Sequence, residues 1–130
     1  MDMNNETTLT RRVIGCAIEV HKTLGPGLLE VIYETCLCRE FTRNGIQFDR
    51  QRKLPVYYKG EPVDCDLKID IVVEDALVIE VKAVQQVLPV HEAQLLTYLR
   101  VSGLPLGLLL NFNKETMKQG IRRRYAAGPV

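Results

Sequence analysis

The stretch Asp70-Ile-Val-Val-Glu-Asp-Ala-Leu-Val-Ile-Glu-Val-Lys82 decides the fold, because it contains a predicted β-hairpin at the centre of the chain. Apolar residues alternate with other residues from Val63 to Val73, which is typical of a half-buried strand. Glu74-Asp75 then predicts a turn. The next segment, Ala76–Lys82, is short and almost continuously apolar, as is typical of a strand inside a sheet.

This hairpin is expected to bring two carboxylates together. If the turn centres on Asp75, Asp70 lies opposite Glu80, because 75 − 70 equals 80 − 75. Their Cβ atoms would then be about 4.5–5.5 Å apart. Two like charges at that distance repel unless a cation lies between them, and a divalent ion with oxygen ligands, such as magnesium, meets that need.

Lys82 is expected on the same strand face as Glu80, because alternate residues of a strand point the same way. An amine there is suited to stabilise a phosphate or to orient an attacking water. The plain alternative is a surface hairpin with Glu–Lys pairs in solvent. Glu80 and Lys82 lie among Ile79, Val81 and Val84, however, and buried charges require a partner. The sequence therefore favours a metal site.

Around the hairpin, the sequence predicts an α/β domain with the order helix, helix, three strands in a meander, helix, strand, helix. Apolar residues recur at helical spacing, and Gly25-Pro26-Gly27 separates the first two helices. The helices are predicted at 8–24, between Gly27 and Gly45, at 89–103 and at 114–125, and the other strands at 46–58 and 106–112. The predicted buried positions are Leu29, Ile32, Tyr33, Cys36, Leu37 and Phe41 in the second helix and Leu95, Leu96 and Leu99 in the third.

Polar residues on two of the helices are further candidates. Glu30 begins the second helix, where the helix dipole also favours an acidic residue for structural reasons. Gln94 and Tyr98 share a face of the third helix at i and i+4, and His91 joins that face at i−3. Taken singly, each of these residues has a structural explanation.

Composition and charge suit a single domain over residues 1–130. The chain has 46% hydrophobic and 25% charged residues, which is ordinary for a globular protein. Its net charge is +1, but residues 39–53 carry five basic and two acidic side chains, residues 114–124 five and one, and residues 59–82 three and seven. An acidic middle between basic segments suits a metal centre flanked by phosphate contacts, although solvated charged surfaces produce the same pattern.

The sequence also predicts a cytoplasmic protein with reduced thiols. No apolar run is long enough to cross a bilayer, so no membrane partner is expected, and residues 1–6 are polar and acidic, unlike a secretory signal. No C-x-x-C pair occurs among the four cysteines. We therefore expect reduced, partly buried thiols rather than an iron–sulfur or zinc site.

Three motifs occur in a specific order: Gly27-x-x-Glu30-x-x-Tyr33, then Asp70 with Glu80-x-Lys82, then Gln94-x-x-x-Tyr98. Together they make the chain resemble the GxxExxY proteins, a family in the PD-(D/E)XK nuclease superfamily. The resemblance runs from about residue 13 to residue 112 and includes the stretches 19–27, 56–60 and 91–98. Each motif is weak alone, and the ordered set is specific.

The resemblance implies a restriction-endonuclease-like αβββαβ core with a mixed central sheet flanked by helices. It implies that Glu30, Asp70 and Glu80 hold a metal, magnesium or manganese in its place, and that Lys82 assists catalysis. The element formed by Gln94 and Tyr98 resembles that of RecB-type nucleases, where it supports the site.

The implied activity is hydrolysis of DNA phosphodiester bonds by a metal-activated water, with DNA ends as one form of recognition. Ile69 stands where the name of the superfamily has proline, a change that the superfamily tolerates. Two alternatives stay open: a non-cleaving nucleic-acid-binding or assembly module on the same fold, and a metal-dependent RNase. The sequence also leaves open whether a second copy of the chain or another protein is a partner.

Overall fold

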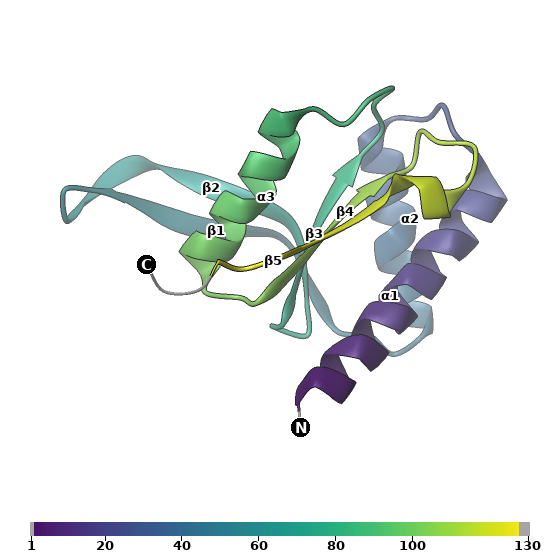
Figure 1. Cartoon of the computed structure of the whole chain (residues 1–130), viewed down its shortest axis with the longest axis horizontal. Helices are drawn as coiled ribbons and strands as arrows, with labels where there is room; N and C mark the ends of the chain where they lie inside the picture. The colour runs from purple at the N-terminus through teal and green to yellow at the C-terminus, as the bar shows by residue number, and fades with distance from the viewer. Residues whose placement is uncertain (1, 128–130) are drawn as a thin grey trace.

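The computed structural model describes residues 2–127, with the side chains of residues 8–127, and shows an α/β fold (Figure 1). Residues 1–6, used above to predict a cytoplasmic location, all lie outside the range whose side chains are described. The chain begins with α1 (Asp2–Leu24), α2 (Glu30–Arg43), β1 (Phe48–Tyr58), β2 (Glu61–Val73) and β3 (Leu77–Lys82). It continues with α3 (Pro89–Ser102), β4 (Leu106–Asn111), the 3-10 helix η1 (Met117–Gly120) and β5 (Ile121–Tyr125).

The strands form one mixed sheet in the order β1-β2-β3-β4-β5. Neighbouring strands are antiparallel except β3 and β4, which run parallel because α3 carries the chain back between them. The predicted fold class is confirmed, as is the order of helix, three strands, helix and strand from α2 to β4.

The basic helix predicted over residues 114–125 is wrong. The structure has η1 and then β5, which pairs antiparallel with β4 from Leu110↔Ile121 to Leu106↔Tyr125. All of β4 is buried, so the backbone groups on its outer edge need hydrogen-bond partners. The preference of consecutive arginines for a helix is weak, and the need to pair the edge of β4 outweighs it.

Both faces of the sheet carry a hydrophobic core. On one face, Val13 of α1 and Leu37 of α2 belong to the same buried cluster as Ile79 of β3. On the other face, Leu95 of α3 belongs to a second buried cluster with Val78 of β3. Adjacent residues of β3 therefore enter different cores, as the alternation of a strand requires.

The predicted buried positions of α2 and α3 are partly correct. Leu29, Ile32 and Leu96 are exposed, at 70%, 37% and 41%, and Cys36 is half-buried. Leu29 precedes the first residue of α2, and helical spacing alone does not define the edges of the stripe that contacts the sheet. The predicted positions that the structure does bury are Tyr33, Leu37, Phe41, Leu95 and Leu99.

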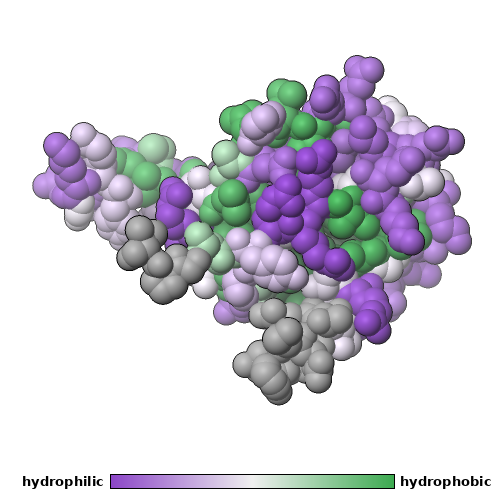
Figure 2. Space-filling view, in the orientation of Figure 1, coloured by the Kyte–Doolittle hydropathy of each residue, from purple (hydrophilic) through white to green (hydrophobic). Residues whose placement is uncertain are grey.

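β1 and β2 extend beyond the rest of the sheet as a two-stranded arm, which stands out from the molecule in Figures 1 and 2. β2 pairs with β3 only from Val73↔Leu77 to Ile71↔Ile79, whereas its pairing with β1 continues to Tyr58↔Glu61. Leu54 and Leu67 are the outermost hairpin residues that pack against a core, and we call residues 55–66 the arm. The hairpin of β1 and β2 thus separates from β3 at the residue that precedes Ile71.

The four cysteines are free thiols. Cys16 and Cys38 are buried and Cys65 is exposed. Burial raises the pKa of Cys38 to about 11, so this thiol stays protonated at neutral pH. Among the helices of residues 2–127, none combines the length and the apolar character that a membrane span requires.

Candidate active site

The turn between β2 and β3 sets the register that the sequence predicted. Glu74-Asp75 occupies it with positive φ angles of 52° and 54°. The last ladder pair is Ile71↔Ile79, so Asp70 and Glu80 lie one step beyond it, where β2 separates from β3. We call Asp70 and Glu80 the carboxylate pair.

Side-chain hydrogen bonds continue the contact between β2 and β3 where the backbone ladder stops. The N–H of Val81 donates to Asp70 Oδ2 at 2.9 Å. The N–H of Asp70 points to Glu80 Oε1, at the longer distance of 3.4 Å. Each carboxylate is therefore held by the backbone of the opposite strand, and the two lie side by side.

Burial makes both members of the carboxylate pair costly to ionise. Glu80 is 3% exposed, and burial, followed by the charge of Asp70, raises its pKa to about 8. Burial also raises the pKa of Asp70, although the hydrogen bond from Val81 opposes the shift. The charge of Lys82 lowers both pKa values, yet no ion pair joins Lys82 to either acid in the described residues. A bound divalent cation would favour the ionised form of both acids.

The chain that follows Lys82 is fastened to the end of β4. Asn111, opposite Lys82 in the parallel ladder, is fully buried. Its Oδ1 accepts the N–H of Val84 at 3.0 Å, and its Nδ2 donates to the carbonyl of Val84 at 2.9 Å. Sequence reasoning missed Asn111, although an amide between Leu110 and Phe112 in an apolar strand was the available signal. The contact between Asn111 and Val84 therefore fixes the backbone directly after Lys82, the last residue of β3.

Glu30 is the first residue of α2 and is exposed. The loop before it is held by Tyr33, whose hydroxyl donates to the carbonyl of Gly25 at 2.5 Å and accepts the N–H of Leu28 at 3.1 Å. Tyr33 is fully buried and stacks on Phe112, with ring centroids 4.7 Å apart. A tyrosine three residues after Glu30 therefore anchors the turn that places Glu30.

Glu30 lies in the vicinity of the carboxylate pair without joining it. After burial, its charge is one of the smaller causes of the raised pKa of Asp70. In the part of the chain that the structure describes, no three His, Cys, Asp or Glu side chains are arranged to hold a metal ion. The three-carboxylate centre stays a prediction. Magnesium commonly takes only one or two protein carboxylates and keeps several waters, so the carboxylate pair fits it as a donor set.

α3 places Tyr98 beside the carboxylate pair. Tyr98 is 6% exposed, and burial, followed by the charges of the two acids, raises its pKa to about 12. Its hydroxyl therefore stays protonated at neutral pH. Gln94, one turn earlier, donates from Nε2 to the Tyr98 hydroxyl at 3.0 Å. His91 has a different role, because its Nδ1 accepts the N–H of Leu88 at 3.0 Å at the start of α3.

Glu34 is a buried acid that sequence reasoning missed. It is 6% exposed and accepts hydrogen bonds from Arg50 Nε at 2.6 Å and from Gln51 Nε2 at 2.9 Å. Its charge contributes to the raised pKa of both members of the carboxylate pair. The available signal was its i, i+4 spacing from Glu30, which places both acids on one helix face. Gln51 has a φ of 55°, a conformation that is rare for a non-glycine residue in a strand.

A family model described as the PD-(D/E)XK nuclease superfamily matches residues 7–124. No curated protein and no solved structure matches the chain. The matched range contains the whole segment from α2 to β4 and all the candidate residues described above.

Proposed function

Because the chain belongs to the PD-(D/E)XK nuclease superfamily, we propose that it hydrolyses phosphodiester bonds of DNA with the help of magnesium, or manganese in its place. Membership of the superfamily supports the general class, a nuclease with a restriction-endonuclease-like core. The metal, the DNA substrate and the closer assignment to the GxxExxY proteins are our proposals. The anchoring of the α2 turn by Tyr33 supports the last of these, because it gives that motif a structural purpose.

The observation that carries the proposal is the contact between Asp70 and Glu80. Glu80 is buried and Asp70 is half-buried, and each accepts a backbone N–H from the opposite strand. Burying two adjacent carboxylates is costly unless a cation compensates them. The amine of Lys82 supplies one positive charge nearby, and a divalent metal would supply the rest.

We propose a role for each residue of this site. Asp70 and Glu80 would hold the metal, with Glu30 as a third carboxylate near them. A metal bound there activates a water molecule and offsets negative charge on the phosphate. Lys82 would stabilise the charge that develops on that phosphate. The protonated Tyr98 can donate a hydrogen bond, and Gln94 orients its hydroxyl.

The test is a cleavage assay with magnesium, manganese or EDTA. Linear, nicked, circular and single-stranded DNA are the substrates, with RNA in parallel. We expect cleavage of DNA only when metal is present, and cleavage of linear but not circular DNA would indicate recognition of ends. Cleavage of RNA alone would favour the RNase, and binding without cleavage in either metal would favour the non-cleaving module.

Asp70→Asn separates a catalytic role from a structural one. The amide oxygen can still accept the N–H of Val81, while the repulsion between Asp70 and Glu80 disappears. We expect cleavage to fall by about 100-fold or more. In EDTA, the free energy of unfolding should be unchanged or higher by about 1 kcal/mol. Magnesium should raise the melting temperature of the wild type by mass action and that of the variant much less.

Thermal melts of both proteins, in EDTA and in millimolar magnesium, accompany the cleavage assay. A lower melting temperature for Asp70→Asn in EDTA, with no response of the wild type to metal, would contradict the proposed role. Asp70→Ala is the control for the structural contact, because it removes the acceptor for Val81 as well. It should cost about 1 kcal/mol of stability through that lost hydrogen bond.

A further inference from the structure

A pocket of about 470 Å³ lies between α2 and β1, outside the carboxylate pair. Three arginines and two threonines line it, and Phe48 forms an apolar part of its wall. The residues from α2 recur at spacings of three and four, so they share one face of the helix. The polar residues are Thr35, Arg39, Thr42 and Arg43 from α2 and Arg50 from β1.

Arg50 connects this pocket to the candidate active site. Its Nε donates to Glu34 Oε2 at 2.6 Å, and its Nη2 donates to Thr35 Oγ1 at 2.9 Å. Glu34 in turn lies close enough to the carboxylate pair for its charge to raise both of their pKa values. The ion pair between Glu34 and Arg50 therefore links the wall of the pocket to an acid whose charge acts on the carboxylate pair.

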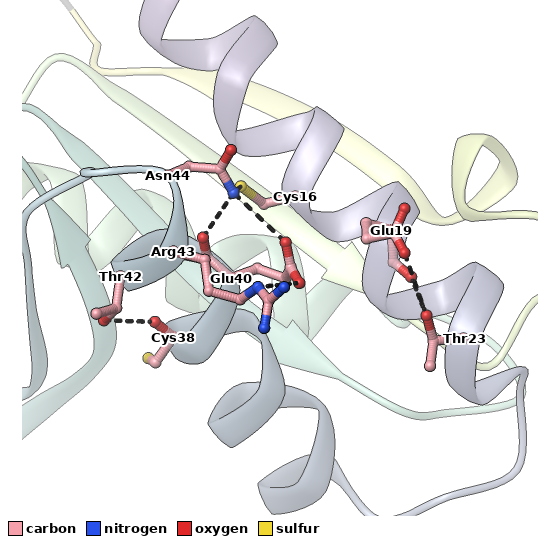
Figure 3. A network of polar contacts seen from close by, with 8 residues as sticks. All are labelled: Cys16, Glu19, Thr23, Cys38, Glu40, Thr42, Arg43 and Asn44. Carbon is pink, nitrogen blue, oxygen red and sulfur yellow. Dashed lines mark hydrogen bonds and ion pairs between the residues drawn. The ribbon is translucent and has the colours of Figure 1, made fainter.

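The other two arginines are available to a ligand. Arg39 is exposed and makes no ion pair or hydrogen bond with the side chains of residues 8–127. Arg43 is 78% exposed and lies 3.8 Å from Glu40, beside it in Figure 3. Such exposed pairs contribute little. Asn44 also contacts Glu40, through Nδ2 at 3.4 Å, so Glu40 keeps a partner if Arg43 turns to a stronger anion.

We propose that this arginine pocket binds a phosphate group of the same nucleic-acid strand that is cut at the carboxylate pair, at a position away from the reacting phosphate. The inference rests on the proposed function, because it takes a nucleic acid as the substrate. Guanidinium groups recognise phosphate oxygens through two parallel hydrogen bonds, and the threonine hydroxyls add further donors. Phe48 offers an apolar surface to the sugar of the same nucleotide.

The basic segment near the C-terminus is a weaker candidate, because two of its arginines are already paired. Arg122 donates to Glu92 at 2.8 Å, and Arg124 also bonds to Glu92. Arg123 is exposed and lies on β5, at the opposite edge of the sheet from β1. It lines a different pocket, so Arg123→Ala is a matched control for the loss of one surface arginine.

The experiment measures binding without cleavage. Fluorescently labelled single-stranded and duplex DNA are titrated with the whole chain in EDTA, and affinity is measured by anisotropy at several salt concentrations. The variants are Arg39→Ala, Arg43→Ala, their combination and the control Arg123→Ala. Arg39→Lys tests whether charge alone is enough. Arg50 is left intact, because its loss would disturb Glu34 in the candidate active site.

We expect the double variant to bind DNA about tenfold more weakly or worse, since a lost charge-assisted hydrogen bond is commonly worth that much. The slope of log affinity against log salt should become shallower by about 1, because the pocket neutralises one phosphate. The control should match the wild type. In a cleavage assay, the double variant should show a raised KM with an unchanged kcat.

The pocket is overturned as a phosphate site if the double variant binds as tightly as the wild type, or if the wild type shows no measurable binding at low salt. A larger loss of DNA affinity with Arg123→Ala than with the double variant would place the phosphate contact on β5, and would also overturn the pocket as a phosphate site. These results are distinct from failure of the proposed function. A wild type that binds through Arg39 and Arg43 but never cleaves would keep the pocket and refute the hydrolysis.

Discussion

At the residue scale, Glu80 shows how the surroundings of one side chain change its chemistry. It is 3% exposed and lies beside the carboxylate of Asp70. Burial, and then the charge of Asp70, raises its pKa from 4.5 to about 8. Between these pH values the folded protein holds a proton that the unfolded chain has released. Stability in the absence of metal therefore falls as the pH rises.

This shift predicts a pH-dependent difference between the wild type and Glu80→Gln in EDTA. Below about pH 4.5, the free energy of unfolding of the two proteins should change with pH in the same way, because Glu80 of the wild type is protonated in both the folded and the unfolded state. As the pH rises to about 8, the cost of ionising Glu80 in the folded state should lower the stability of the wild type. The glutamine cannot ionise, so the variant should gain stability relative to the wild type across that range. Urea unfolding at pH 5 and pH 8 measures the difference. Parallel pH profiles for the two proteins would contradict the prediction.

At the element scale, η1 and β4 hold the end of β3 in place. Asn111 at the end of β4 bonds to both backbone groups of Val84, just after β3. Gly120 at the end of η1 packs directly on Asn111, and a Cβ at Gly120 would overlap the backbone oxygen of Asn111. This close approach explains why glycine stands there, and it couples the last turn before β5 to the strand end that carries Lys82.

Two glycine substitutions test that packing. Gly120→Ala should lower the free energy of unfolding by about 1–3 kcal/mol, because the backbone of η1 or β4 must shift. Gly15→Ala is the matched control: apart from its chain neighbours and the adjacent backbone of α1, no atom lies within 4 Å of the added Cβ, so alanine should raise stability by about 0.5–1 kcal/mol. Urea denaturation measures both. Equal stability of the two variants would show that η1 does not pack on β4 as described.

At the scale of the whole molecule, the chain divides into a body with two cores and the arm. Leu54 and Leu67 end the packing of the hairpin against the α3 core. Beyond them, Tyr57 and Tyr58 are 62% and 65% exposed. A two-stranded hairpin without a packed face is marginally stable by itself. We therefore expect the stability of the body not to depend on the arm.

Shortening the arm tests this division. Residues 55–66 are replaced by Asn-Gly, a two-residue turn that joins the paired residues Leu54 and Leu67. The free energy of unfolding should change by less than about 1 kcal/mol, because little packed surface is lost. Leu109→Ala, in the fully buried part of β4, is the contrast and should cost about 2–5 kcal/mol. Loss of cooperative unfolding on shortening would show that the arm supports the body.

Local sequence determined the features that depend on neighbouring residues. The turn at Glu74-Asp75 was readable from residue types, and simple counting from it placed Asp70 next to Glu80, as the structure shows. Helical spacing likewise located α1, α2 and α3, and it identified most of the buried residues of α2 and α3. These features share one cause: the period of a strand or helix and the chemistry of a turn act over a few residues.

Only the tertiary structure decided the features that depend on distant parts of the chain. β5 forms because the edge of β4 needs a pairing strand, and the residue types at 121–125 do not indicate this requirement. Glu34 is buried because Arg50 and Gln51, from a different element, supply its hydrogen bonds. The arginine pocket forms where α2 meets β1. In each case the deciding free energy comes from a partner far away in sequence, which local patterns cannot reveal.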